Sequence, residues 1–344
     1  MKESSSWKIF TFLVVQSLLI FVVVLLNLIL IIVFRSSSLS TNTSVIATTD
    51  LNFVKILLNQ QPCAQCGCPF IQPVFEDNIT SRIVNGEIAQ PHSWPWHALL
   101  VVYNRNGIWS SACGASLLSS RYVLTAAHCV HGHSATAIYI HTGLHEITNK
   151  TLSPFNGYQG RSIYIHESYS QFLLNHDIAL IKLKNQILQD NRTIGFSCLD
   201  LEDDGGENKH EEDYNELFVA GWGRISGNPL NYTTSTLLKQ LKLNYISPFD
   251  QRCAMVIGQA DQYRPGQMCA WNANGSACRG DSGGALVRRV KLNEQYYYQQ
   301  VGIVSGSISC GFKDQMPETY TRIKYYTKWI KNIVQYAELD YEND

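Results

Sequence analysis

Three residues of this chain have the types and the local sequences that nucleophilic catalysis requires. Ser282 lies in the run Gly-Asp-Ser-Gly-Gly, His128 in Thr-Ala-Ala-His-Cys and Asp177 in His-Asp-Ile-Ala-Leu. A serine hydroxyl is a poor nucleophile near neutral pH, so it needs an adjacent base, and that base needs an orienting partner. We therefore expect Ser282 to be the nucleophile, His128 the general base and then acid, and Asp177 the carboxylate that orients the histidine.

The glycines around Ser282 suit the same chemistry. The backbone N–H groups of Gly280 and Ser282 are expected to point at the oxyanion that develops on an attacked carbonyl, where a side chain would crowd the substrate. Donors of this kind are worth about 3 kcal/mol each in transition-state stabilisation.

A fourth run, Ile-Val-Asn-Gly, begins at Ile83 directly after Arg82. Taken together in this order, the four runs resemble the chymotrypsin/trypsin-like serine proteases, and the resemblance covers about residues 66–335. The chain order His, Asp, Ser also matches that family. The resemblance implies an all-β fold of two six-stranded antiparallel β-barrels with a C-terminal helix, and a serine endopeptidase active site in the cleft between the barrels.

The resemblance also implies an activation switch. Cleavage after Arg82, by a trypsin-like protease or by the enzyme itself, would free the α-amino group of Ile83 to pair with the buried Asp281. A buried charge is tolerated only when it is paired, so formation of this pair would order the catalytic turn.

The substrate-binding residues depart from the family pattern. The resemblance puts Ser276 at the floor of the pocket for the P1 side chain, the one on the acyl side of the scissile bond. Glu318 stands where the family has a pocket-wall glycine, and Ser305-Gly306-Ser307 stands where it has Ser-Trp-Gly. A neutral floor beside a carboxylate predicts that both basic and aromatic P1 side chains are accepted. Two alternatives remain: Glu318 turns away from the pocket, or Glu318 and Ser307 occlude it and restrict P1 to small residues.

Ten cysteines indicate an oxidising compartment. The resemblance implies four disulfides, namely Cys66–Cys198, Cys113–Cys129, Cys253–Cys269 and Cys278–Cys310. A further family disulfide is missing, since Leu217 and Arg288 occupy its two positions. Cys63 and Cys68 remain as a local pair, as a link to another chain, or with Cys66 as zinc ligands on spacing alone. No cofactor is expected, and no calcium, because Leu144 replaces the glutamate that opens the calcium loop.

The elements that would position these residues are short strands. β-branched and aromatic runs between turn signals predict strands at His97–Tyr103, Cys113–Leu118, Tyr122–Leu124, Ile178–Leu183, Leu217–Ala220 and Gln299–Val304. Near the C-terminus the apolar period becomes helical, at Tyr326, Trp329, Ile330, Ile333 and Val334.

The N-terminal part lies outside the resemblance. Ile9 to Phe34 is apolar enough for a helix of roughly 39 Å, longer than a bilayer core. We expect a cytoplasmic tail (1–8), a transmembrane signal-anchor (9–34), a stem with the activation segment (35–82) and the protease domain (83–344). This predicts a single-pass type II membrane protein with an extracellular protease; a cleaved signal and secretion are the alternative.

Composition and charge restrict the partners. The net charge of −1 at pH 7 gives no reason to expect a nucleic-acid partner. Sequons for N-glycosylation lie at Asn42, Asn78, Asn149, Asn191, Asn231 and Asn274. The acidic segment 202–216 is either a solvated insertion or a partner-binding exosite.

The expected partners are protein or peptide substrates, the activating protease and the membrane. The competing function is a catalytically silent protease-fold protein in adhesion or as a decoy.

Overall fold

The computed structural model describes residues 62–75, 86–148, 150–190, 192–201, 214, 216–226, 232–257, 266–273, 275–292, 295–306 and 316–339. The predicted tail and anchor, most of the stem, and the acidic residues 202–213 lie outside this part of the chain. The same holds for Arg82, Ile83, Ser307, Cys310 and the asparagines of all six sequons.

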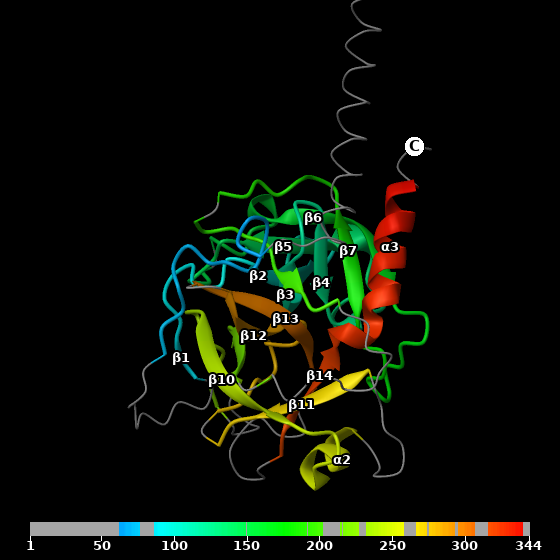
Figure 1. Ribbon diagram of the computed structural model, residues 1–344. Helices are drawn as coiled ribbons and strands as arrows, with labels where there is room; N and C mark the ends of the chain where they lie inside the picture. Colours follow the sequence, from blue (N-terminus) through cyan, green and yellow to red (C-terminus); the bar gives the residue numbers. More distant parts are fainter. Residues whose placement is uncertain are drawn as a thin grey trace, which may run out of the picture.

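The first half of the described chain forms a closed six-stranded antiparallel barrel. Its strands pair in the order β2-β3-β4-β7-β6-β5. Their bounds are β2 (His97–Tyr103), β3 (Trp109–Leu117), β4 (Tyr122–Thr125), β5 (Ile138–Thr142), β6 (Tyr158–Ile165) and β7 (Ala179–Leu183). This barrel is the upper body in Figure 1.

The second half forms another ring, in the order β10-β11-β14-β13-β12-β9, which the pairing of β9 with β10 closes. Its strands are β9 (Leu217–Gly221), β10 (Lys239–Ile246), β11 (Gln267–Trp271), β12 (Ala285–Leu292), β13 (Gln295–Gly306) and β14 (Glu318–Arg322). Two short strands lie at its edges: β1 (Glu87–Ile88) pairs with β10, and β8 (Cys198–Leu199) pairs in parallel with β13. The prediction of two six-stranded antiparallel barrels is confirmed.

Strand β2 contributes side chains both to the core of the first barrel and to the cluster that joins the two barrels. Successive side chains of a strand point to opposite faces. Leu100 and Val102 therefore pack into the core of the first barrel, while Leu99 and Val101 pack in a second cluster with Trp96 and with side chains of the other barrel. That second cluster joins the barrels and includes Phe218 of β9 and Trp222. Burying each such side chain contributes about 1.5–3 kcal/mol, so the two barrels are held as one body.

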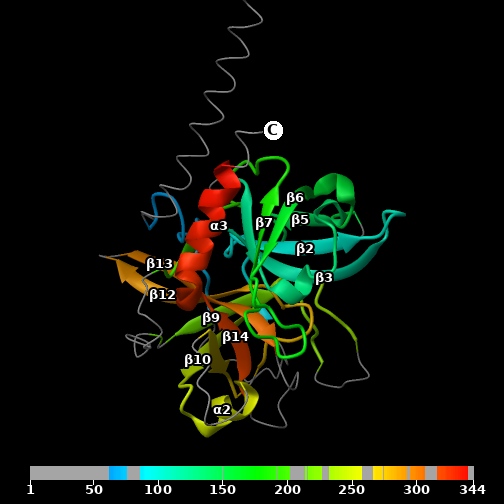
Figure 2. The ribbon, with the colours of Figure 1, turned by 90° about the vertical axis from the view of Figure 1, so that its right-hand side faces the viewer.

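The helices are few. Helix α2 (Gln251–Ile257) is short, and α3 (Thr327–Leu339) follows a 3-10 turn at Ile323–Tyr326. Ile330 and Val334 of α3 are fully buried in the core cluster of the first barrel. Both views show α3 lying along β7, so the C-terminal helix predicted from the apolar spacing is confirmed (Figures 1 and 2). Within the described ranges, no helix combines the length and the apolar character that crossing a membrane requires.

Disulfides tie the segments together. The structure contains Cys66–Cys198, Cys113–Cys129 and Cys253–Cys269, and it adds Cys63–Cys68. Cys278 is also disulfide-bonded, but its expected partner Cys310 lies outside the described residues. Of the three possibilities for Cys63 and Cys68, the local pair is therefore the one formed. The zinc possibility is wrong, because zinc needs thiolates and all three of its sulfurs are in disulfides.

Candidate active site

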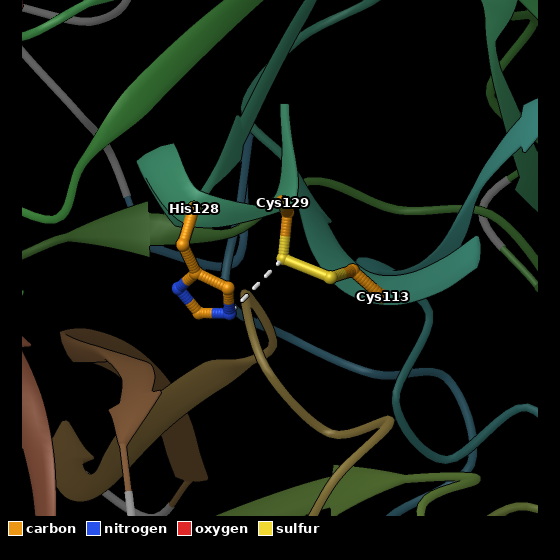
Figure 3. A group of neighbouring side chains, drawn as sticks. All are labelled: Cys113, His128 and Cys129. Atoms are coloured by element: carbon orange, nitrogen blue, oxygen red, sulfur yellow. Dashed lines mark hydrogen bonds between the residues drawn. A yellow bond between two sulfur atoms is a disulfide. The ribbon is translucent and has the colours of Figure 1, made fainter. Parts of the chain in front are cut away.

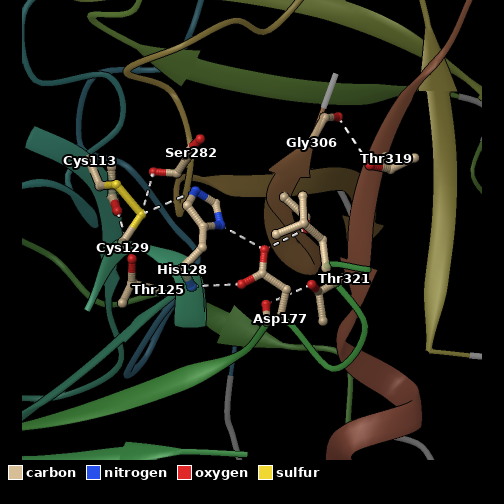
Figure 4. A network of polar contacts seen from close by, with 12 residues as sticks. Cys113, Thr125, His128, Cys129, Asp177, Ser282, Gly306, Thr319 and Thr321 are labelled. Atoms are coloured by element: carbon tan, nitrogen blue, oxygen red, sulfur yellow. Dashed lines mark hydrogen bonds and ion pairs between the residues drawn. A yellow bond between two sulfur atoms is a disulfide. The ribbon is translucent and has the colours of Figure 1, made fainter. Parts of the chain in front are cut away.

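Asp177 is fixed by groups from both barrels. It lies two residues before β7 and is only 1% exposed. The hydroxyl of Ser305, on β13, donates a hydrogen bond to its Oδ2 atom at 2.5 Å, and Thr321, on β14, donates to its backbone carbonyl at 2.7 Å. The backbone N–H of His128 donates to Oδ1 at 2.9 Å (Figure 4). A buried carboxylate with this many donors is held in one orientation.

His128 lies in a 3-10 turn, Ala127–Cys129, directly after β4. Its Nδ1 atom is 2.7 Å from Oδ2 of Asp177. Since an ionised carboxylate only accepts, Nδ1 carries the proton in this bond, and in the neutral ring Nε2 is left with a lone pair. The His128 side chain is 25% exposed, whereas the Asp177 side chain is 0% exposed. The imidazole of His128 is therefore partly open to solvent, while the Asp177 carboxylate is shielded from water.

Ser282 lies next to the His128 ring in Figure 4. Its backbone carbonyl accepts a hydrogen bond from the N–H of Gly114 at 2.7 Å, which ties the turn to β3. No hydrogen bond joins the Ser282 hydroxyl to the ring in the described structure; the Nε2 atom is instead 3.6 Å from the Cys129 sulfur. In unliganded enzymes the nucleophile–base contact often tightens only when substrate binds.

The turn around Ser282 depends on two glycines with positive φ. Gly280 has φ 102° and Gly283 has φ 83°. A Cβ atom on Gly283 would lie 2.4 Å from the carbonyl oxygen of Gly114, so only glycine fits. The N–H groups of Asp281, Gly283 and Gly284 are all used in backbone hydrogen bonds. Those of Gly280 and Ser282 have no such bond to any described residue, so they are available to an oxyanion.

The Asp281 side chain lies against Gly221 of β9 and Gly223. Its carboxylate accepts hydrogen bonds from the N–H of Gly223 at 2.8 Å and from the N–H of Cys278 at 2.9 Å. Burial raises the pKa of Asp281 to about 6, against the effect of these two bonds. The carboxylate borders a small cavity that Lys239 and Leu241 also line. Ile83, its expected partner, lies outside the described residues.

The expected floor and wall of the P1 pocket lie together. Glu318 begins β14, is 2% exposed, and lies beside Ser276 and Ala277. The Ser276 hydroxyl donates to the Ala277 carbonyl at 3.1 Å. Burial, with a smaller contribution from the charge of Asp281, raises the pKa of Glu318 to about 8. The side chain is therefore packed beside Ser276 and is not turned out into solvent.

Two residues of the site have roles that the sequence did not indicate. Ser305 is predicted to contact substrate, and its side chain in addition donates a hydrogen bond to Asp177. Thr321 was not expected to take part, although its hydroxyl holds the Asp177 backbone. Their contacts span 128 and 144 positions of the chain, so no local pattern could have revealed them.

One cluster has a ligand set that superficially suits a metal. Cys113, His128 and Cys129 bring their donor atoms within 4.8 Å of one another. Figure 3 shows the two sulfurs joined in a disulfide, so they supply no thiolate. The cluster is His128, the predicted general base, beside a disulfide.

The two barrels and this site define a serine protease of the trypsin class. The family model described as Trypsin matches residues 83–330, so the chain belongs to the trypsin family. It is 34% identical to chymotrypsin-C of Bos taurus over 279 residues, which cover 79% of this chain and 94% of that protein. Chymotrypsin-C of Mus musculus is 35% identical over 282 residues, covering 79% and 95%. Transmembrane protease serine 11G of Rattus norvegicus is 32% identical over 256 residues, covering 73% of this chain and 55% of that protein. The chain is accordingly a serine endopeptidase.

Proposed function

We propose that this endopeptidase hydrolyses peptide bonds through Ser282, His128 and Asp177, with Gly280 and Ser282 supplying the oxyanion donors. The observation that carries the proposal is the 2.7 Å contact between His128 and an Asp177 carboxylate that Ser305 and the His128 backbone also hold. This arrangement leaves Nε2 of the neutral ring as the proton acceptor, on the side of Ser282.

In the first step the Ser282 hydroxyl rotates toward His128, transfers its proton to Nε2 and attacks the scissile carbonyl. The charge that develops on the carbonyl oxygen is met by the N–H groups of Gly280 and Ser282. The imidazolium, stabilised by Asp177, then protonates the leaving amine. A water molecule repeats the sequence on the acyl-enzyme and releases the second product.

Replacement of the nucleophile tests this mechanism. Ser282→Ala should reduce peptide hydrolysis to near background and abolish labelling by a fluorophosphonate, without loss of folding. Ser134→Ala, at an exposed serine far from the catalytic turn in sequence, is the matched control and should keep both properties. If the Ser282 variant keeps more than about a thousandth of the activity, the assignment is wrong, since loss of a triad nucleophile normally costs far more. A wild-type protein that never labels after activation would favour the silent, adhesion or decoy alternative.

Activation is the second part of the proposal. Cleavage after Arg82 would free the amino group of Ile83, and the cavity beside Asp281 is where that ammonium would bind. Support comes from the Asp281 carboxylate, which is 6% exposed, has a raised pKa and forms no ion pair with any described residue. A cation there would restore the charge of the carboxylate and hold the catalytic turn. Either a trypsin-like protease or the enzyme itself would make the cut.

We also propose that the protease acts outside the cell, tethered by residues 9–34 with the N-terminus in the cytoplasm. Three disulfides among the described residues besides Cys63–Cys68 agree with an oxidising compartment. An N-terminal tag should stay with intact cells and be protected from added protease. Tagged protein released into the medium would contradict the anchor, and loss of the tag with a secreted protease domain would favour a cleaved signal.

The P1 pocket completes the proposal. Ser276 as floor and Glu318 as wall favour acceptance of aromatic side chains and, when the carboxyl is charged, of basic ones. A library of peptides that vary only at P1 would establish this preference.

A further inference from the structure

Two imidazole rings stack on one another next to the proposed orienting carboxylate. His166 follows β6, and His176 immediately precedes Asp177 in the chain. Their ring centroids lie 4.7 Å apart at an interplanar angle of 14°. The backbone N–H of His166 also donates to the carbonyl of Ile178 at 3.2 Å. The two histidines therefore close the base of the loop 167–175 and join the end of β6 to the segment that carries Asp177.

The backbone of His176 determines how Asp177 leaves the chain. His176 has φ 51°, a left-handed conformation that a residue other than glycine keeps only where its surroundings hold it. Its carbonyl accepts a hydrogen bond from the N–H of Ile178 at 2.8 Å, so a tight three-residue turn is centred on Asp177. A change in the conformation of His176 would therefore move the catalytic carboxylate.

The C-terminal region holds both imidazole rings. The Nδ1 atom of His176 and the hydroxyl of Tyr326 are 3.2 Å apart and share a hydrogen bond, and Tyr326 is buried in the core of the first barrel. The ring of His166 lies against Trp329 of α3, with centroids 5.4 Å apart. The 3-10 turn and α3 thus support the stacked pair, and through His176 they support the backbone of Asp177.

The hydrogen bonds of His166 show where a further proton must go. Its Nδ1 atom accepts from the backbone N–H of Ser168 at 3.2 Å, so in the neutral ring Nε2 carries the proton. An added proton must then bind to Nδ1, where it would face that N–H and break the bond. It would also place a cation against the second imidazole of the stack. Protonation of His166 is therefore incompatible with the observed arrangement.

Burial and one carboxylate act on the charge of the pair. Burial lowers the pKa of both His166 and His176, and the neighbouring imidazole lowers that of His166 further. Glu167 acts in the opposite direction on both rings. Its Oε2 atom is 3.9 Å from Nδ1 of His166, but the Glu167 side chain is 75% exposed, so water screens its charge.

The 3-10 turn and α3 bring no charge to the pair. The rings of Tyr325 and Tyr326 lie 6.4 and 5.8 Å from that of His176. Burial raises the pKa of Tyr326, and Tyr325 and the Asp177 carboxylate act in the same direction, so the hydroxyl stays protonated. Trp329 of α3 is uncharged. The pair is therefore neutral near pH 7 and takes up a proton only below the ordinary histidine value of about 6.5.

We propose that His166 and His176 are positioning residues for Asp177, and that a proton taken up by His166 in acid loosens the stacked pair and slows catalysis. This inference rests on the proposed role of Asp177 and adds a regulation by pH to that site. A catalytic group that is misplaced by about 1 Å can cost about a hundredfold in rate. Because Ser305 and Thr321 still hold Asp177, we expect a smaller loss, about fivefold.

Two substitutions of His166 in the activated enzyme separate the stack from the proton. His166→Ala removes the ring, so kcat near pH 8 should fall by about fivefold while KM stays nearly unchanged. His166→Phe keeps a ring against His176 but cannot bind a proton, so it should restore kcat at this pH. His133→Ala, at an exposed histidine, is the matched control and should behave as the wild type. Wild-type kcat in His166→Ala, or a loss that phenylalanine does not restore, would overturn the proposal.

The acid effect is measured as the ratio of wild-type kcat/KM to that of His166→Phe. Protonation of the general base His128 is common to both proteins, so it cancels in this ratio. The ratio should be close to one near pH 8 and should fall to about one fifth as the pH drops well below about 6.5. A ratio that does not change with pH would refute the role of the proton.

Thermal unfolding of Ser282→Ala protein, with and without His166→Phe, tests the pair without turnover. Since the folded state disfavours a proton on the pair, the unfolded chain binds it more readily. The protein that keeps His166 should therefore lose stability relative to the phenylalanine variant as the pH falls below about 6.5, and the difference should be constant above that range.

Fluorophosphonate labelling of the wild type reports the triad independently of these measurements. A labelled enzyme in which the activity ratio and the stability difference are both independent of pH overturns this inference alone. An acid-sensitive stability difference in a protein that never labels supports the histidine pair and counts against the proposed triad.

Discussion

Ser305→Ala tests whether the second barrel supports the catalytic base of the first. The serine hydroxyl donates to Asp177 Oδ2 at 2.5 Å, the same atom that His128 Nδ1 contacts at 2.7 Å. Removing the hydroxyl leaves Asp177 with the two His128 donors, so the imidazole should stay bound but with a less firmly oriented carboxylate.

The magnitude follows from the kind of bond that is lost. A hydrogen bond to a charged group contributes about 1.5–3 kcal/mol. Since two donors remain on the Asp177 carboxylate and water can enter the small space, we expect the low end, about 1.5 kcal/mol, which is slightly more than tenfold in rate. The loss should fall on kcat and leave KM nearly unchanged, because the Ser305 side chain is directed at Asp177.

The assay is steady-state hydrolysis of the best P1 peptide, together with the rate of fluorophosphonate labelling. Ser116→Ala is the matched control, because Ser116 is also buried but donates to a neutral carbonyl, that of Leu124, at 3.4 Å. The control should lower thermal stability without reducing kcat. Wild-type kcat in Ser305→Ala would refute the claim that this hydroxyl supports catalysis, and a loss confined to KM would mean that Ser305 acts on substrate.

The remaining predictions concern activation and assembly. Arg82→Gln should leave an intact chain that does not label, and Asp281→Asn should be cleaved yet remain unlabelled; full activity in an uncleaved chain would contradict the switch. After cleavage, the N-terminal segment should stay attached through Cys66–Cys198 and separate only on reduction in a denaturing gel. Cys198→Ala should release it without reduction, and continued attachment would point to a different link.

Much of the fold could be predicted because its strands carry local signals. The interval His97–Tyr103 is strand β2 as expected, since every residue in it is buried and suits a strand packed on both faces. The strand expected at Cys113 instead starts at Trp109, because the exposed hairpin end has no apolar alternation to mark it. Strands such as β10 and β12 were missed for the same reason: they mix charged and apolar residues, and their neighbours in the ring determine their burial.

The sequence shows that the family disulfide at positions 217 and 288 is missing, but it does not show which contacts take its place. Leu217 and Arg288 lie directly opposite each other on β9 and β12. Leu217 packs in the core of the second barrel, while the Arg288 guanidinium donates to Gln299 Oε1 at 2.9 and 2.7 Å and lies over the Tyr214 ring.

The polar contacts of Arg288 extend to Tyr214 and Asp200. The Tyr214 hydroxyl donates to the buried Asp200 at 3.0 Å, and the Arg288 guanidinium is 3.9 Å from the same carboxylate. In place of the family disulfide, the structure thus has a polar network. Its members are Asp200, Tyr214, Arg288 and Gln299. Because the network is buried, removing one member should destabilise the fold by leaving its partner unsatisfied. That dependence arises from contacts between distant segments, so the sequence at positions 217 and 288 alone could not reveal it.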